Sequence, residues 1–115
     1  MKMKILMISP ECAPFSKAGG LGDMVSSISK RFAEAGCDVK IFTPLYALVK
    51  RSGGMKKQMD NLSVHMGLGL EYGASVWSAP LGRAEALLLE FNMYFDRPGI
   101  YNYNGVDFSD NGGRF

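Results

Sequence analysis

The spacing of apolar residues predicts a strand, a helix and a second strand at the start of the chain. Lys4 to Ser9 contains a short, continuous apolar run of the kind found in buried parallel strands. Between Leu21 and Ala35 the apolar residues recur every three or four positions, which predicts one face of a helix. The residues of this expected face are Leu21, Val25, Ile28, Phe32 and Ala35. A second strand is expected over Asp38 to Thr43, completing a right-handed βαβ unit with parallel strands.

The middle of the chain carries the two-residue period of β-strands. Apolar and polar residues alternate strictly from Leu62 to Leu70, which predicts a half-buried strand. A weaker strand is expected over Ala74 to Leu81, with tight turns at 71–73 before it and at 82–83 after it. The polar segment Met55 to Asn61 is expected to be a loop.

The last predicted strand is the apolar run Leu87 to Leu89, followed by Phe91. It is expected to lie within the sheet. These strands together predict an antiparallel meander beside the parallel unit, in an α/β, Rossmann-like three-layer fold. Asn92 to Asn111 is rich in turn-forming residues and tyrosine, so we expect a loop that carries binding residues. If the strands at Lys4 and Leu87 are parallel, the loops that follow them share the ligand-binding edge of the sheet.

The segment between the first strand and the helix carries the strongest chemical signal. Lys17, Gly19, Gly20 and Gly22 lie directly before the helical pattern. Glycines let the backbone approach a ligand closely, and a helix N-terminus offers free N–H groups that suit anions. This predicts a cradle for a phosphate or sugar phosphate. The alternative is a loop that uses glycines to turn into the helix, with a solvated Lys17. The spacing fits neither a Walker A loop nor the dinucleotide-binding fingerprint.

Composition narrows the remaining classes of function. A chain of 115 residues with a net charge of +2 is one domain, without the basic, aromatic-rich patch of nucleic-acid-binding proteins. Cys12 and Cys37 form no disulfide framework, which indicates a reduced, cytoplasmic setting. Cys12 lies in the expected site loop, but no neighbouring base is evident and a structural thiol is expected. No residue cluster predicts a metal site, no cofactor is expected, and His65 is expected at the surface.

Three separated motifs resemble those of one enzyme family. Lys17 to Asp23, K-A-G-G-L-G-D, resembles the K-x-G-G-L-x-D signature of bacterial glycogen synthases and plant starch synthases. Tyr94 to Tyr101 resembles the family's Y-F-x-R-x-x-x-Y segment, and Asp110 to Phe115 its D-N-x-x-R-F segment. Ala35 to Val39 resembles the joint between its first helix and second strand. The resemblance covers nearly the whole chain but only the first part of the family's much longer protein.

The resemblance implies a fold and an activity. The family has the GT-B fold, two Rossmann-like domains facing across a cleft, and transfers glucose from ADP-glucose or UDP-glucose to an α-1,4-glucan with retention. Carried over by resemblance, Lys17, Gly19, Gly20 and Tyr101 bind the sugar donor, although packing of the loop is an equal alternative for Tyr101. Asp23 matches the signature aspartate, as a sugar contact or as a helix cap. No residue of this chain matches a catalytic group.

Other matched residues have structural alternatives. Glu11 either orients the Lys17 loop by hydrogen bonding or is exposed. Arg97 is expected to form an ion pair with Asp96 that fixes its loop. Asp110, Asn111 and Arg114 are expected to cap and pack a final helix.

The resemblance also implies what is missing. Residues 1–115 correspond to part of the N-terminal domain, and the C-terminal nucleotide-binding domain is absent, so the isolated chain is expected to be inactive. A second hypothesis is a binding or assembly module without chemistry. In that case the sheet edge left open after the Leu87 strand pairs with a second copy in a homodimer. A nicotinamide-binding domain is a third, less favoured hypothesis.

Overall fold

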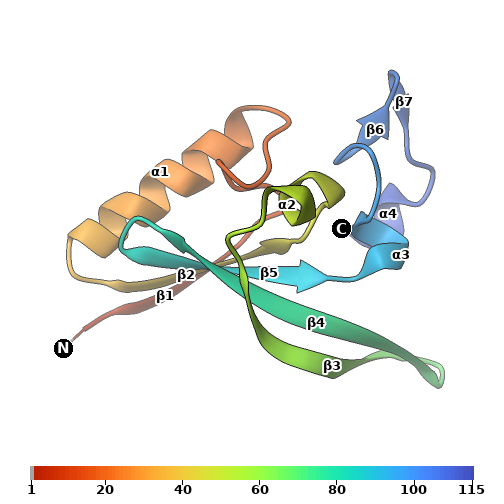
Figure 1. The fold of residues 1–115 in the computed structure, drawn as a ribbon, viewed down its shortest axis with the longest axis horizontal. Helices are drawn as coiled ribbons and strands as arrows, with labels where there is room; N and C mark the ends of the chain where they lie inside the picture. Colours follow the sequence, from red (N-terminus) through yellow and green to blue (C-terminus); the bar gives the residue numbers. More distant parts are fainter. Residues whose placement is uncertain (1) are drawn as a thin grey trace.

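The computed structural model describes residues 2–115, apart from the side chains of residues 51 and 52, and shows a mixed five-stranded sheet (Figure 1). Its strands are β1 (Lys4–Ile8), β2 (Asp38–Pro44), β3 (Lys56–Gly67), β4 (Leu70–Leu81) and β5 (Ala84–Glu90), in the spatial order β1-β2-β5-β4-β3. The helices are α1 (Gly20–Glu34), α2 (Ala47–Ser52), α3 (Asn92–Phe95) and α4 (Asn111–Arg114). A separate small hairpin is formed by β6 (Asn102–Tyr103) and β7 (Val106–Asp107).

The parallel half of the sheet confirms the predicted βαβ unit. β1 pairs with β2 in parallel, with Ile5 opposite Val39. β2 pairs with β5 in parallel, with Ile41 opposite Ala86. The carboxyl ends of β1, β2 and β5 therefore share one edge of the sheet. The loops that follow β1 and β5 meet there, as expected.

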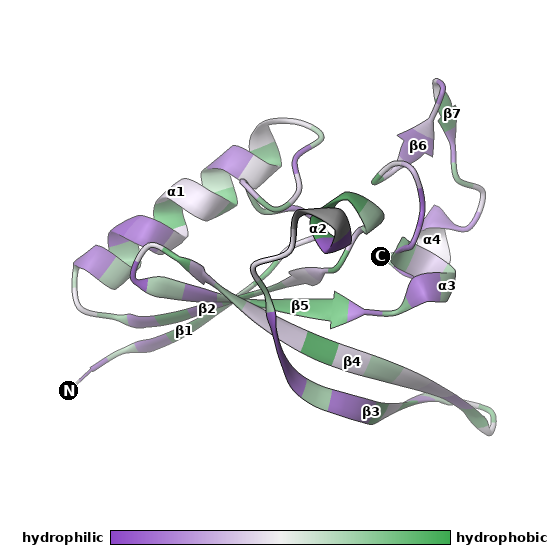
Figure 2. Cartoon of the chain, viewed as in Figure 1, coloured by the Kyte–Doolittle hydropathy of each residue, from purple (hydrophilic) through white to green (hydrophobic). Residues whose placement is uncertain are grey.

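The antiparallel half differs from the prediction in two places. Met55 to Asn61 is not a loop, because β3 begins at Lys56. The turn between β3 and β4 lies at residues 68–69 rather than 71–73, with a positive φ of 51° at Leu68. β3 is an edge strand with most of its residues exposed, so its sequence can stay polar. The strands in Figure 2 show this contrast, since β5 is mainly hydrophobic and β3 carries hydrophilic stretches.

Helix α1 forms where expected, but of its expected apolar face only Val25 is buried. Leu21, Ile28 and Phe32 are 36–40% exposed. The residues that are buried are Gly22, Val25, Ser26, Ser29 and Ala33. Most of these side chains are small, whereas the larger apolar residues of the expected face are partly exposed to solvent.

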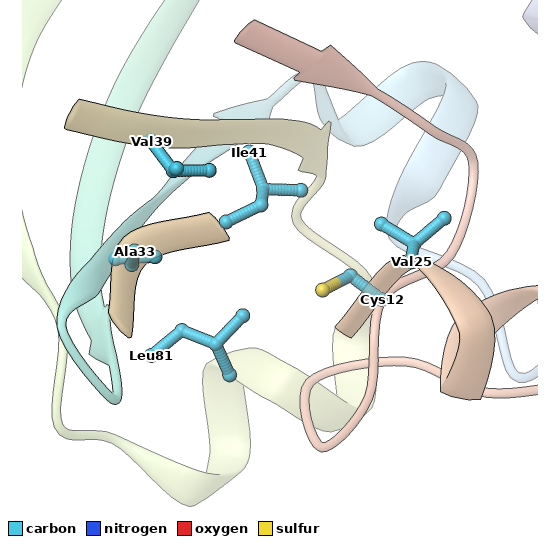
Figure 3. Close-up of a cluster of buried hydrophobic side chains, with 7 residues drawn as sticks. Cys12, Val25, Ala33, Val39, Ile41 and Leu81 are labelled. Atoms are coloured by element: carbon cyan, nitrogen blue, oxygen red, sulfur yellow. The ribbon is translucent and has the colours of Figure 1, made fainter. Parts of the chain in front are cut away.

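Two hydrophobic clusters hold the fold together. The first joins α1 to the sheet (Figure 3), and its members are Cys12, Val25, Ala33, Val39, Ile41, Leu81 and Ala84. The second lies under α2 and α3 and consists of Leu45, Tyr46, Val49, Ala79, Leu88 and Phe95. β1 lies at the sheet edge with Leu6 59% and Ile8 76% exposed. Within the part of the chain that the structure describes, no helix has the length and apolar character needed to cross a membrane.

Candidate functional site

The loop between β1 and α1 folds back on itself. The Ser16 amide donates to the Cys12 carbonyl at 2.8 Å, and the Cys12 amide donates to the Ser16 hydroxyl at 3.1 Å. The Ala13 amide donates to the Gly22 carbonyl at 3.0 Å, which ties the loop to the first turn of α1. Cys12 is fully buried, and burial raises the pKa of its thiol to about 11. It is a structural thiol, as expected.

Glu11 is the centre of this loop. Its side chain is buried, with the residue 2% exposed. One carboxylate oxygen, Oε1, accepts hydrogen bonds from the amides of Ala18, Gly19 and Gly22 at 3.3, 3.2 and 2.9 Å. The other, Oε2, accepts one from the Tyr101 hydroxyl at 2.6 Å. The hypothesis that Glu11 orients the Lys17 loop is confirmed, and the alternative of simple exposure is wrong.

The hydrogen bonds also set the ionisation of Glu11. Burial raises the pKa of its carboxyl, but the hydrogen bonds from Tyr101 and from the three amides outweigh burial and hold the pKa below its ordinary value. The carboxylate lies at the N-terminus of α1, where the helix dipole favours a negative charge. Glu11 thus occupies part of the anion cradle that the glycines predict for a ligand.

Gly22 is the glycine that this geometry requires. A Cβ at Gly22 lies 3.0 Å from the Ser16 carbonyl oxygen and 3.1 Å from Oε1 of Glu11. A Cβ at Gly19 or Gly20 meets no atom within 4 Å. Sequence reasoning placed the weight on Gly19 and Gly20. It missed the role of Gly22. The Glu11 carboxylate accepts from the Gly22 amide and lies so close that a side chain at residue 22 would have no room.

Lys17 and Asp23 form an ion pair on the outside of the loop. Their Nζ and Oδ2 atoms are 2.7 Å apart, and both side chains are more than half exposed. Asp23 does not cap α1, because Gly19 is at the N-cap position and the amides of Gly19 and Gly22 donate to Glu11 instead. The Lys17 ammonium is accessible because its side chain is more than half exposed. An exposed ion pair stabilises little, so Asp23 can be replaced by another partner.

Lys17 borders a cavity of about 740 Å³ at the carboxyl edge of the sheet. Residues 14–18 form one wall, and residues 97–100 with Asn102 form another. Tyr46 and Val49, at the start of α2, contribute a third, apolar wall. The Tyr46 hydroxyl donates to the Pro10 carbonyl at 2.5 Å, so the same residue anchors the start of the site loop. Sequence reasoning missed Tyr46, which belongs to no motif.

Tyr101 is brought to the Lys17 loop but not into the cavity wall. It follows directly on the residues that line the cavity, yet its hydroxyl points to Glu11. Burial, and then the hydrogen bond to Glu11, raise the pKa of the Tyr101 hydroxyl. Of the four predicted donor-binding residues, Lys17 therefore borders the cavity directly, whereas Tyr101 and Gly19 contact Glu11.

The loop after α3 is fixed by a different ion pair from the one expected. Arg97 does not pair with Asp96. Its two guanidinium nitrogens each lie 2.6 Å from an oxygen of Asp110, and one also donates to the Met93 carbonyl. Asp110 precedes α4, but its carboxylate is used by Arg97 and not to cap the helix. Asn111 donates to the Tyr101 carbonyl at 2.8 Å, which holds Tyr101 from the other side.

Arg114 is a buried cation, with only 6% of the residue exposed. It donates to the carbonyls of Tyr94 and Ile100 at 2.7 and 2.9 Å and to the Asn111 side chain at 2.7 Å. The expectation that Arg114 packs the final helix is confirmed. Elsewhere, His65 is exposed and lies 3.9 Å from Glu71. No group of metal-ligating side chains is found among residues 2–115.

Comparisons with known proteins agree with the motifs. A family model described as the starch synthase catalytic domain matches residues 4–115. The chain is 41% identical to glycogen synthase 1 of Geobacter metallireducens, over 99% of this chain and 23% of that protein. It is 37% identical to the glycogen synthase of Myxococcus xanthus, over 98% of this chain and 24% of that protein. The chain thus spans about a quarter of the length of these relatives.

A solved structure has the same fold. The catalytic domain of starch synthase IV from Arabidopsis thaliana, bound to ADP and acarbose, superimposes with a TM-score of 0.73. The match covers 90% of this chain and 22% of that one, at 22% sequence identity. The mixed sheet and its helices match a fragment of the GT-B fold.

Proposed function

Because the chain belongs to the starch synthase catalytic domain family, we propose that it is the donor-facing, N-terminal part of a glycogen or starch synthase. Such an enzyme transfers glucose from ADP-glucose, or UDP-glucose, to an α-1,4-glucan with retention. The observation that carries the proposal is the cavity at the carboxyl edge of the sheet, bordered by the accessible cation Lys17. That edge is where open α/β sheets bind their ligands.

In this proposal Lys17 exchanges Asp23 for the phosphate or the glucosyl unit of the donor. Gly19 and Gly20 keep the backbone open beside it, since a Cβ at either residue would contact no other part of the chain within 4 Å. The cation stabilises the negative charge that develops as the nucleotide leaves, which is electrostatic catalysis. The starch synthase neighbour that binds ADP and acarbose supports a nucleotide and a glucan as ligands of this fold.

We also propose that residues 1–115 correspond to part of the N-terminal domain of such an enzyme, and that this stretch by itself does not catalyse transfer. The donor preference between ADP-glucose and UDP-glucose then depends on residues outside this chain. A cytoplasmic setting fits the two free cysteines, Cys12 and Cys37.

The Lys17→Ala variant tests the donor site. The unsubstituted chain is expected to bind ADP-glucose weakly and without glucosyl transfer, and Lys17→Ala is expected to weaken binding by about tenfold, the effect of losing one charge-assisted contact. Isothermal titration measures the affinity, and release of ADP with maltooligosaccharide as acceptor measures transfer. Lys40→Ala is the matched control, since Lys40 is also exposed and paired, with Glu85 at 3.2 Å, away from the cavity.

Equal affinity of the Lys17→Ala and unsubstituted chains contradicts the donor role of Lys17. Robust turnover by the unsubstituted chain contradicts the proposed inactivity. Tighter binding of a nicotinamide cofactor than of ADP-glucose contradicts the proposal that the cavity binds a sugar nucleotide.

A second candidate function is an assembly module that forms a homodimer. The open edge is not beside the Leu87 strand, because β5 lies between β2 and β4. The open edges are those of β1 and β3, and β1 also exposes Leu6 and Ile8. Edge-to-edge pairing of two β1 strands around a two-fold axis is therefore the proposed contact.

Light scattering tests the assembly hypothesis. A mass twice that of the 12.6 kDa chain is expected, and Leu6→Lys with Ile8→Lys is expected to give a monomer. A monomeric unsubstituted chain at millimolar concentration contradicts the hypothesis. Met66→Lys, on the exposed strand β3, is the control for added charge.

A further inference from the structure

Two segments at opposite ends of the chain meet at one carboxylate. Glu11 lies directly after β1, and Tyr101 lies ninety residues later, after α3. Residues 14–18 and residues 97–100 both line the cavity. The bond between Tyr101 and Glu11, at 2.6 Å, is a direct side-chain link between the segments that carry these residues. Neither Glu11 nor Tyr101 lines the cavity itself.

Both oxygens of the Glu11 carboxylate and the proton of the Tyr101 hydroxyl take part in hydrogen bonds. Oε1 of Glu11 accepts three amide hydrogens, and Oε2 accepts the Tyr101 hydroxyl. Hydrogen bonds to an ionised acceptor are short and about twice as strong as neutral ones. Asn111 holds the backbone of Tyr101 at its carbonyl, so the ring enters from a fixed position. The Tyr101 proton is taken by Glu11, so a donor molecule that accepted a hydrogen bond from the Tyr101 hydroxyl would have to displace Glu11.

We propose that Tyr101 is a positioning residue for the sugar-donor site: it holds Glu11, and Glu11 in turn holds the amides of Ala18, Gly19 and Gly22 so that Lys17 faces the cavity. This inference rests on the proposed function. It assigns Tyr101 a role through the protein rather than through contact with the donor. Lys17 then depends on Tyr101, although the two side chains do not touch.

The inference has a spectroscopic signature that direct donor contact lacks. Amide protons bonded to a carboxylate resonate downfield, so those of Gly19 and Gly22 report the Glu11 contact in the absence of ligand. Glu11→Gln removes the charge and marks the upfield limit of each signal. In Tyr101→Phe the carboxylate loses its second anchor, and we expect both amide signals to move towards that limit.

The experiment measures amide chemical shifts and ADP-glucose affinity in the full 115-residue chain and in three variants, Glu11→Gln, Tyr101→Phe and Tyr103→Phe. Tyr101→Phe is expected to move both amide signals and to weaken ADP-glucose binding by about fivefold to tenfold. Tyr103→Phe is the matched control, because Tyr103 lies two residues away on the exposed strand β6. It is expected to leave both signals and the affinity unchanged.

Each outcome separates the inference from the function it rests on. Unmoved amide signals in Tyr101→Phe overturn the inference, and a lower affinity in that case identifies direct donor contact. Moved signals with unchanged affinity overturn the positioning role while the donor site stands. Failure of the unsubstituted chain to bind ADP-glucose contradicts the proposed function, and the amide signals then decide alone whether Tyr101 holds the loop.

Discussion

Replacing Glu11 by alanine is expected to lower the free energy of unfolding by about 3 kcal/mol. The change removes the acceptor of three backbone amides and of the Tyr101 hydroxyl at a position that is 2% exposed. Each buried donor left without a partner costs about 1–3 kcal/mol, and partial access of water to the loop reduces the sum. The helix N-terminus also loses a favourable negative charge.

Urea denaturation followed by circular dichroism measures this loss. Glu34→Ala is the matched control, since Glu34 is an exposed carboxylate on α1, 3.7 Å from Arg31, and a change within about 0.5 kcal/mol is expected there. A loss in Glu11→Ala no larger than in the control would show that the amides find water at no cost. It would also remove the basis for the role of Glu11 in orienting Lys17.

The same carboxylate predicts a pH dependence with a definite sign. The pKa of Glu11 in the folded chain is below its ordinary value of 4.5. The unfolded chain therefore binds the proton more tightly, and the stabilisation is complete above that value. It is lost as the pH falls through the lower, folded pKa. Stability curves of the unsubstituted chain and of Glu11→Gln are expected to converge in that acid range.

The sequence was sufficient for the parts of the fold that follow from local periodicity. The run of apolar residues in β1 and the periodicity of α1 are local signals, and the parallel pairing follows from a helix that connects the two strands. The course of β3 was not predictable in the same way. An edge strand is half solvated, so its polar residues 56–61 resemble a loop in sequence.

The buried face of α1 shows why periodicity can mislead. The pattern of Leu21, Ile28 and Phe32 is a valid helical stripe, but these residues are 36–40% exposed. The buried face carries small residues such as Gly22 and Ser29, and the contacts of Gly22 with Ser16 and Glu11 leave no room for a side chain. Hydrophobicity alone therefore ranks the wrong face first.

The candidate site was predictable in its position but not in its internal bonds. The glycine-rich turn after β1 indicated the edge of the sheet and the cation Lys17. The contact between Glu11 and Tyr101 joins residues ninety positions apart, and no local pattern encodes it. The role of Gly22 followed only once the Glu11 carboxylate was placed against its amide.

Replacing Arg114 by alanine is the second large effect, with an expected loss of about 3 kcal/mol in the free energy of unfolding. The guanidinium donates to the carbonyls of Tyr94 and Ile100, which would be left without that partner. It also lies 4.9 and 5.0 Å from the ring centres of Phe108 and Phe115, and such contacts add about 0.5–2 kcal/mol each.

The cost of burying this cation predicts an order among the substitutions. Arg114 has no ion pair among residues 2–115, and its Nη2 atom is buried without a hydrogen-bond partner. Burial accordingly lowers the pKa of Arg114. Since the charge is poorly compensated, Arg114→Met should lose less stability than Arg114→Ala, because methionine fills the space between the rings without a charge.

Thermal and urea unfolding of the two variants test this order. The control is Arg83→Ala, in the exposed turn between β4 and β5, for which the free energy of unfolding is expected to change by no more than about 0.5 kcal/mol. A loss in Arg114→Met as large as that in Arg114→Ala would contradict this order. It would mean that the hydrogen bonds, which both variants lack, hold the guanidinium in place and that packing between the rings adds nothing. In either case the Asn92 to Asn111 segment, and with it Tyr101, depends on Arg114 through Ile100, so the ADP-glucose affinity should fall together with the stability.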